Sequence, residues 1–136
     1  RSTQGVSSAA SDVYKRQTKD NVTKVVDKDT PGAKYSELEY EVLDVMDTDE
    51  GTLTYVLVEL ITGRHHQIRA QFAKRKCGIW GDTKYNPKFQ KTKKKYKEIG
   101  LHASRLEFDH PTTGEHMVFK HEPEGGAFAI LDLDEF

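Results

Sequence analysis

The first regular pattern along the chain lies between residues 36 and 46, where apolar and acidic side chains alternate. The apolar positions are Leu38, Tyr40 and Val42, and the acidic positions are Glu37, Glu39 and Glu41. This period of two residues predicts a half-exposed antiparallel strand. Residues 53–62 are apolar on both faces, which is typical of a central strand. The turn at residues 47–51 joins the two, so we expect a β-hairpin.

One helix is predicted over residues 65–76, where Ile68 and Phe72 form a narrow apolar stripe and Gly78 provides the end. A strand is predicted over 99–108, with a bulge where the apolar phase shifts between Ala103 and Leu106. A turn over 109–114 leads to a partner strand over 115–121, and residues 125–136 fit a short terminal helix or a loose tail. The expected fold is α+β, with a mixed, mainly antiparallel sheet and one or two packed helices.

The first 17 residues differ in composition from the rest, being rich in Ser and Ala without helical or strand periodicity. We interpret residues 1–17 as a foreign-looking leader, such as a translated cloning junction, or as an ordinary disordered N-terminus. The domain is then expected over residues 18–136, a length that can bury a modest core.

Composition narrows the protein class. Hydrophobic residues make up 35% and charged residues 32%, and no apolar run approaches the ~20 residues of a membrane span. The single cysteine, Cys77, excludes an internal disulfide and fits a cytoplasmic location. A net charge of −1 conceals a basic block over residues 74–97 between acidic segments. This asymmetry predicts a localised anionic partner such as RNA, and no membrane partner.

A dense polar group follows Gly63, a residue able to take a tight or positive-φ turn. Its members are Arg64, His65, His66, Gln67 and Arg69. The group indicates a functional site, and a solvated helix start is the alternative. On a helix Arg64 and Arg69 would lie about 140° apart, so one can face an internal acid while the other meets solvent or phosphate. No zinc-binding His spacing is present, so no metal is expected.

Four motifs occur in order: Leu60-x-Thr-Gly-Arg-x-His-Gln-Ile-Arg69, Gly78-Ile-x-Gly-Asp-x-x-Tyr85, Leu101-His-Ala103, and Phe108-x-His-Pro111 followed by Gly114. Together they resemble the RluA-type (ribosomal large-subunit) family of RNA pseudouridine synthases. The resemblance extends from near Lys19 to near Pro123. It implies isomerisation of uridine to pseudouridine in structured RNA, ribosomal or transfer, with no cofactor or metal.

In that chemistry an active-site Asp works at the uridine while the bond from C1′ to N1 breaks, the base turns, and C1′ bonds to C5. The base must first leave its stack, at a cost of roughly a few kcal/mol. The resemblance implies that Arg69 pairs with that Asp and keeps it ionised. The implied RNA contacts are Arg64, His66, Gln67, Lys74, Arg75 and Lys76. The implied structural residues near the pocket are Gly63, Ile68, Gly81, Asp82 and Tyr85.

One family feature is absent: the chain contains no Arg-Leu-Asp, the motif that carries the catalytic Asp. We therefore expect the C-terminal part of a catalytic domain, inactive alone, with uncovered strand edges and apolar faces. The alternative is a non-catalytic RNA-binding module. The lysine-rich segment 88–97, with Phe89 and Tyr96, fits either phosphate binding with base stacking or a solvated loop.

Overall fold

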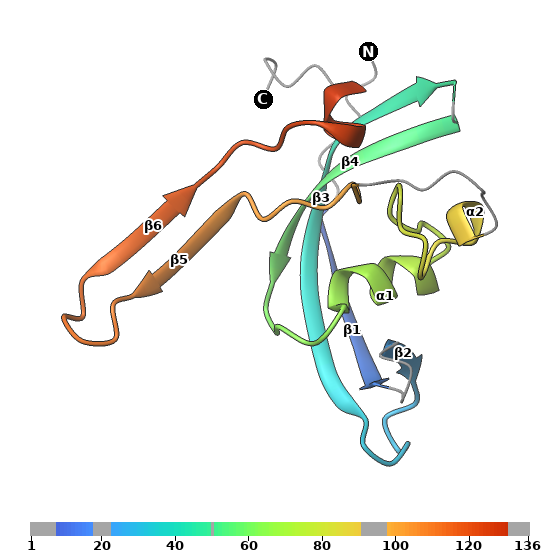
Figure 1. The fold of residues 1–136 in the computed structure, drawn as a ribbon. Helices are drawn as coiled ribbons and strands as arrows, with labels where there is room; N and C mark the ends of the chain where they lie inside the picture. Colours follow the sequence, from blue (N-terminus) through green and yellow to red (C-terminus); the bar gives the residue numbers. More distant parts are fainter. Residues whose placement is uncertain (1–7, 18–22, 50, 91–97, 131–136) are drawn as a thin grey trace.

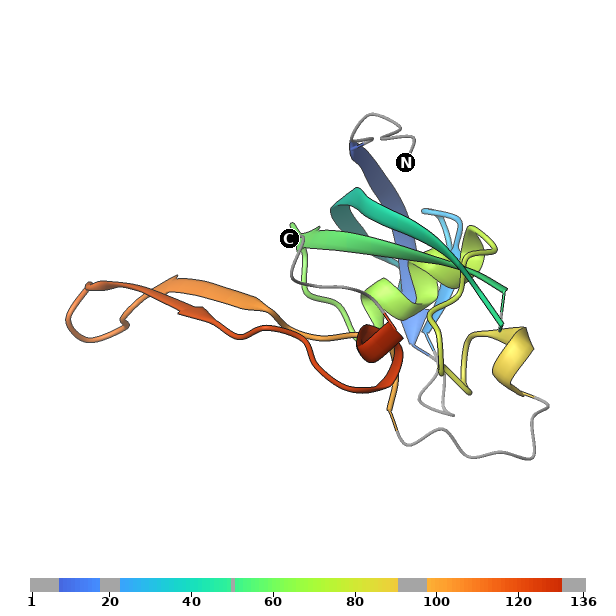
Figure 2. The same ribbon diagram turned by 90° about the horizontal axis from the view of Figure 1, so that it is seen from above.

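The computed structural model describes residues 8–17, 23–49, 51–90 and 98–130. A four-stranded antiparallel sheet has the strand order β2-β1-β3-β4, and helix α1 packs against one of its faces (Figure 1). Its elements are β1 (Ser8–Gln17), β2 (Thr23–Val26), β3 (Lys34–Thr48), β4 (Gly51–Leu60) and α1 (Gln67–Lys74). A separate hairpin, β5 (Arg105–Asp109) with β6 (His116–Lys120), projects away from the sheet (Figure 2). The α+β prediction is confirmed.

Strands β3 and β4 form the hairpin that the alternating pattern predicted. Their register pairs Leu38 with Leu60 and Val42 with Val56, and a bulge interrupts it between Val42 and Asp44. The predicted inward face is confirmed at Leu38, which is 1% exposed beneath α1. The central position predicted for β4 is wrong, because β4 is an edge strand of the described sheet and Leu60 is half exposed.

Residues 8–17 form a strand, so the expectation that the first 17 residues contain no regular element is wrong for this part. Strand β1 pairs with β3 from Ser8 opposite Glu41 to Lys15 opposite Lys34, and with β2 on its other side. Backbone hydrogen bonds build such a ladder without any side-chain periodicity. The 15 residues of β3 supply a long edge for it. The foreign origin of residues 1–17 stays a prediction.

Helix α1 is shorter at both ends than the predicted 65–76. His66 has φ 49°, a left-handed conformation that cannot continue a helix, so the helix starts at Gln67. Lys76, with φ 61°, ends it: its amide donates to Ala73 O, and the amide of Cys77 donates to Phe72 O. These bonds form a Schellman motif, which places the end before the predicted Gly78.

The C-terminal half departs from expectation in two places. Strand β5 starts only at Arg105, so the phase shift marks the beginning of a strand instead of a bulge within one. In the predicted polar loop, residues 87–90 form the one-turn helix α2 (Pro87–Gln90), and Phe89 is buried against Trp80 with ring centroids 5.8 Å apart. Phe89 therefore cannot stack on an RNA base. Residues 91–97 lie outside the described part of the chain.

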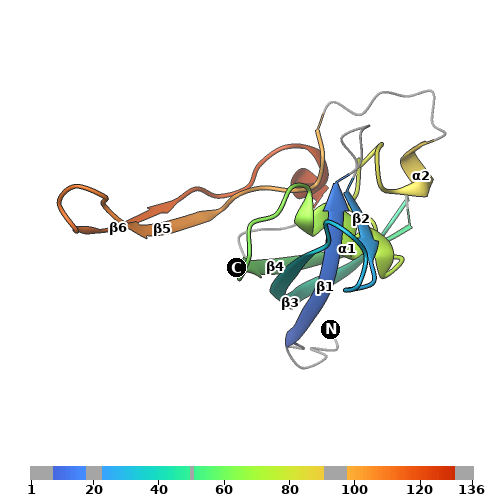
Figure 3. The ribbon, with the colours of Figure 1, turned by 90° about the horizontal axis from the view of Figure 1, so that it is seen from below.

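The predicted turn and partner strand after β5 are confirmed. Gly114 takes φ 71° in the turn, and β6 pairs antiparallel with β5 over its whole length. A short 3-10 helix, η1 (Gly126–Ile130), follows, so the terminal-helix alternative holds for these residues, while 131–136 lie outside the description. Figure 3 shows the same separation of the hairpin from the sheet and helices. Within the described residues, no helix is long and apolar enough to cross a bilayer.

Candidate active site at the start of helix α1

The turn between β4 and α1 is held by one buried amide. Gln67 is 3% exposed, and its Oε1 accepts from Thr62 Oγ1 at 2.8 Å and from the Arg64 amide at 2.9 Å. Its Nε2 donates to Glu37 O in β3 at 3.0 Å. The Gln67 side chain thus fixes the turn against the sheet, and we leave it out of the proposed RNA contacts.

Arg69, on the first turn of α1, forms a bidentate ion pair with Asp82. Its Nε donates to Oδ2 at 2.9 Å and its Nη2 to Oδ1 at 2.8 Å. Asp82 is 1% exposed, and its Oδ1 also accepts from the backbone amides of Lys84 and Tyr85. Burial alone would raise the pKa of Asp82, but these donors outweigh it and hold the pKa below its ordinary value. The hydrogen bonds to Asp82 in turn raise the pKa of Arg69.

Tyr85 connects this ion pair to His66. The Arg69 Cζ lies 5.0 Å from the centre of the Tyr85 ring, within the range of a cation–π contact. The Tyr85 hydroxyl is 2.7 Å from His66 Nδ1, and the His66 ring stacks on that of His65 at 3.7 Å. Burial, followed by the nearby charge of Arg69, lowers the pKa of His66. This shift favours the neutral imidazole, whose Nδ1 can accept a hydrogen bond from the hydroxyl.

One edge of the Arg69 guanidinium is not occupied by Asp82. Arginine carries five N–H donors in a planar fork, and Asp82 occupies only the Nε and one Nη2 direction. In the described part of the chain no further acceptor binds this guanidinium, and the side chain is 22% exposed. Its Nη1–Nη2 edge has the geometry to bind a second carboxylate in bidentate fashion.

The other predicted residues fall into distinct places. Arg64 is exposed and its Nε donates to Tyr35 O at 3.1 Å, so the prediction that one arginine faces an internal acid and the other the surface is confirmed. The conformational role expected of Gly63 is wrong: it has no positive φ, and an added Cβ would meet nothing. Gly81 does have that role, with φ +78° and a Cβ position 2.6 Å from Glu98 O.

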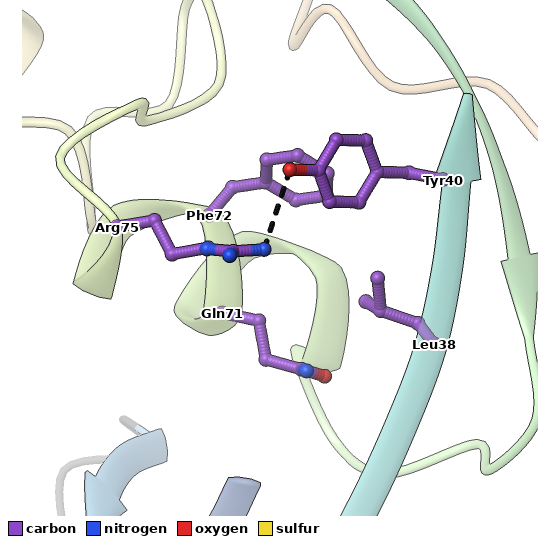
Figure 4. A pocket seen from close by; sticks show the side chains of 5 residues that line it. All are labelled: Leu38, Tyr40, Gln71, Phe72 and Arg75. Atoms are coloured by element: carbon purple, nitrogen blue, oxygen red, sulfur yellow. Dashed lines mark hydrogen bonds between the residues drawn. The ribbon is translucent and has the colours of Figure 1, made fainter. Parts of the chain in front are cut away.

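The basic residues at the end of α1 are exposed. Figure 4 shows the Arg75 guanidinium drawn back toward β3, where its Nη1 donates to the Tyr40 hydroxyl at 3.3 Å beside Phe72. Lys74 and Lys76 remain on the surface nearby, and Ile68 is half-buried. Among the described residues, no group of three or more His, Cys, Asp or Glu side chains is arranged to hold a metal ion.

The family resemblance implied that Asp82 lies near the pocket, but the pairing of Asp82 with Arg69 was not predicted. The signal was present, since Asp82 is the only acidic residue between Glu59 and Glu98. A partly buried arginine on α1 favours a carboxylate partner, and Asp82 is the first acidic residue that follows Arg69 in the chain.

Comparisons with known proteins agree with the motifs. The RNA pseudouridylate synthase family profile matches residues 5–74, a range that starts within the segment set apart as a leader and includes Arg69. An uncharacterized RNA pseudouridine synthase, YlyB, of Bacillus subtilis is 42% identical over 81 residues, which are 59% of this chain and 26% of that protein. The ribosomal large subunit pseudouridine synthase D of Vibrio cholerae is 36% identical over 80 residues, covering 52% and 24%.

A third relative, the tRNA pseudouridine synthase C of Salmonella typhi, is 39% identical over 75 residues, or 51% of this chain and 29% of that protein. The chain thus spans about a quarter of the length of the curated relatives that it matches. The profile match alone covers half of the chain. On these matches and on the motifs around Arg69, the chain belongs to the RNA pseudouridylate synthase family, and within it to the RluA type.

Proposed function

We propose that this chain supplies the arginine side of the active site of an RNA pseudouridine synthase, which isomerises uridine in ribosomal or transfer RNA. The observation that carries the proposal is the state of Arg69. Asp82 fixes one edge of its guanidinium, and the other edge has the donors that a catalytic carboxylate needs. Family membership supplies the reaction class.

In the proposed reaction, Arg69 binds the catalytic carboxylate through its Nη1–Nη2 edge. The positive charge keeps that carboxylate ionised, and the planar fork sets its direction toward C1′ of the flipped uridine. Asp82 does not itself reach the RNA, because it is buried and committed to Arg69 and two backbone amides. No cofactor or metal takes part, and a cytoplasmic location goes with the RNA substrate.

RNA contact is proposed for the exposed cations around this site. Arg64 lies on the turn before α1, while Lys74, Arg75 and Lys76 lie at its end. Each cation that meets a phosphate releases counterions, so binding should weaken as salt rises. His66 belongs to the wall of the site through Tyr85.

The test is isomerisation by a chimera. The part of the Bacillus subtilis relative that precedes its matched region is joined to residues 18–136 of this chain, and the RNA substrate carries tritium at C5 of uridine. Isomerisation forms the C1′–C5 bond and releases that tritium to water. We expect release from the chimera and none from this chain alone.

Two results would count against the proposal. If the chimera folds and binds RNA but releases no tritium, the hypothesis of a non-catalytic RNA-binding module is favoured. If this chain alone releases tritium, the proposed need for a carboxylate from the Arg-Leu-Asp motif is wrong. Separate ribosomal and transfer RNA transcripts in the same assay identify the substrate class.

A further inference from the structure

His66 occupies a conformation that its place at the start of the helix does not explain. It is the N-cap residue of α1 with φ 49° and ψ 30°, yet its side chain makes no capping hydrogen bond. Left-handed backbone is uncommon for residues with a Cβ, although His adopts it more often than most. Strain of this kind persists only where surrounding contacts hold it, and here the imidazole contacts the Tyr85 hydroxyl.

Tyr85 makes two contacts that together transmit the position of His66 to Arg69. Its hydroxyl bonds His66 Nδ1 at 2.7 Å, which fixes the rotation of the phenol about its place in the loop. Its ring face lies 5.0 Å from the Arg69 Cζ, and its backbone amide donates to Asp82 Oδ1. The same residue therefore touches both members of the ion pair.

We propose that His66 is a positioning residue: through the hydroxyl and ring of Tyr85 it holds the Arg69 guanidinium in the plane where its second edge can receive a carboxylate. The inference rests on the proposed function, in which the second edge of Arg69 binds a catalytic carboxylate. The left-handed backbone at His66 is required because it directs the imidazole toward Tyr85 and away from the capping position. The neutral imidazole accepts a hydrogen bond from the phenolic O–H, so the Tyr85 hydroxyl keeps a single direction.

The test uses the RNA-free chain and nuclear magnetic resonance of the Arg69 Nε–Hε group, assigned by its loss in Arg69→Lys. His66→Gly removes the imidazole while allowing the same φ without strain, and Tyr85→Phe keeps the ring but removes the hydroxyl. Loss of one hydrogen bond corresponds to about tenfold in an equilibrium. We therefore expect exchange of Hε with water to become about tenfold faster in either variant, and no faster when the two are combined.

The matched control is Lys76→Gly. Lys76 is the other non-glycine residue with positive φ in the described part of the chain, and it lies at the opposite end of α1. Both glycine variants should unfold at the same or a higher urea concentration than the parent chain, but only His66→Gly should speed Arg69 exchange. This combination separates positioning from general stability.

Unchanged Arg69 exchange in folded His66→Gly or Tyr85→Phe would overturn the inference, as would equal acceleration by Lys76→Gly. Tyr85→Phe leaves the backbone of His66 untouched, so it decides the question even if His66→Gly fails to fold. Since no isomerisation is measured, failure of the chimera leaves this result intact. An active chimera together with unchanged exchange would overturn the positioning role alone.

Discussion

Removal of either partner from the Arg69–Asp82 pair should destabilise the chain strongly, and a double-mutant cycle measures how much of that loss belongs to the pair. The single variants are Arg69→Gln and Asp82→Asn, which preserve approximate shape while removing charge. Asp82→Asn leaves the guanidinium half-buried without a counter-charge, and Arg69→Gln leaves a carboxylate with 0% side-chain exposure. Both therefore leave a poorly solvated charge.

The magnitude follows from burial and geometry. Breaking a fully buried ion pair costs about 3–5 kcal/mol, and the partial exposure of Arg69 reduces this to about 2–4 kcal/mol for Asp82→Asn. Two short charge-assisted bonds in bidentate geometry place the coupling energy at about 2 kcal/mol. The exposed pair of Arg105 and Glu107 has the same 2.8 Å separation but side-chain exposures of 56% and 43%. A parallel cycle there should show no measurable coupling.

The assay is urea unfolding followed by the fluorescence of Trp80, the single tryptophan, which lies next to Gly81 and Asp82 in the chain. The pKa of Asp82 is lower in the folded chain than its ordinary value of 3.8. Its contribution is therefore complete above about pH 3.8 and disappears as the pH falls through the folded-state pKa. A coupling energy below about 0.5 kcal/mol at pH 7, or equal coupling in the two cycles, would show that the Arg69–Asp82 pair does not stabilise the fold as proposed.

Further predictions concern the backbone and the histidines. Gly81→Ala should lower the free energy of unfolding by more than about 2 kcal/mol, because the added Cβ meets Glu98 O in a left-handed backbone, whereas Gly63→Ala should be close to neutral. His66 should titrate below pH 6.5, and His116 above it because its ring nitrogens bond two carboxylates. The contribution of His66 to the free energy of unfolding should therefore rise as the pH increases toward 6.5. The contribution of His116 should fall as the pH rises above 6.5. Titration of the two histidine proton resonances in the reverse order would contradict both expectations.

The parts of the fold that sequence could predict are those where the side-chain pattern reflects burial. Alternation around Leu38 predicted β3 correctly, because that residue faces α1 and its neighbours do not. The same logic failed for β4, whose apolar residues on both faces suggested a covered strand. Leu57 and Leu60 are about half exposed in the described structure, as expected for uncovered apolar faces. An apolar pattern indicates which side chains are suited to burial. It does not indicate whether the described residues contain the surface that covers them.

Features set by the backbone alone escaped prediction. Strand β1 is held by main-chain pairing with β3, which leaves no periodic signature in residues 8–17. The left-handed conformations of His66 and Lys76 fix both ends of α1, and neither residue type signals such a conformation as glycine would.

At the candidate site, too, the motifs predicted which residues lie close together, whereas tertiary packing determines the individual contacts of each side chain. Motif order placed Arg69, Asp82 and Tyr85 near one pocket, and the structure brings all three together. Gln67 is left out of the proposed RNA contacts, because its side chain is buried and donates to the carbonyl of Glu37. That partner lies thirty residues earlier in the chain, so the local sequence did not indicate it.

The most direct measurement of the central claim is tritium release by the chimera carrying Arg69→Gln, compared with the parent chimera and with Glu107→Gln as a control on the exposed hairpin. Circular dichroism confirms that each protein is folded before the assay. We expect tritium release by the parent chimera and by Glu107→Gln, and loss of release in Arg69→Gln with RNA binding retained. Near-normal release by folded Arg69→Gln would contradict the role of Arg69 as the residue that holds the catalytic carboxylate.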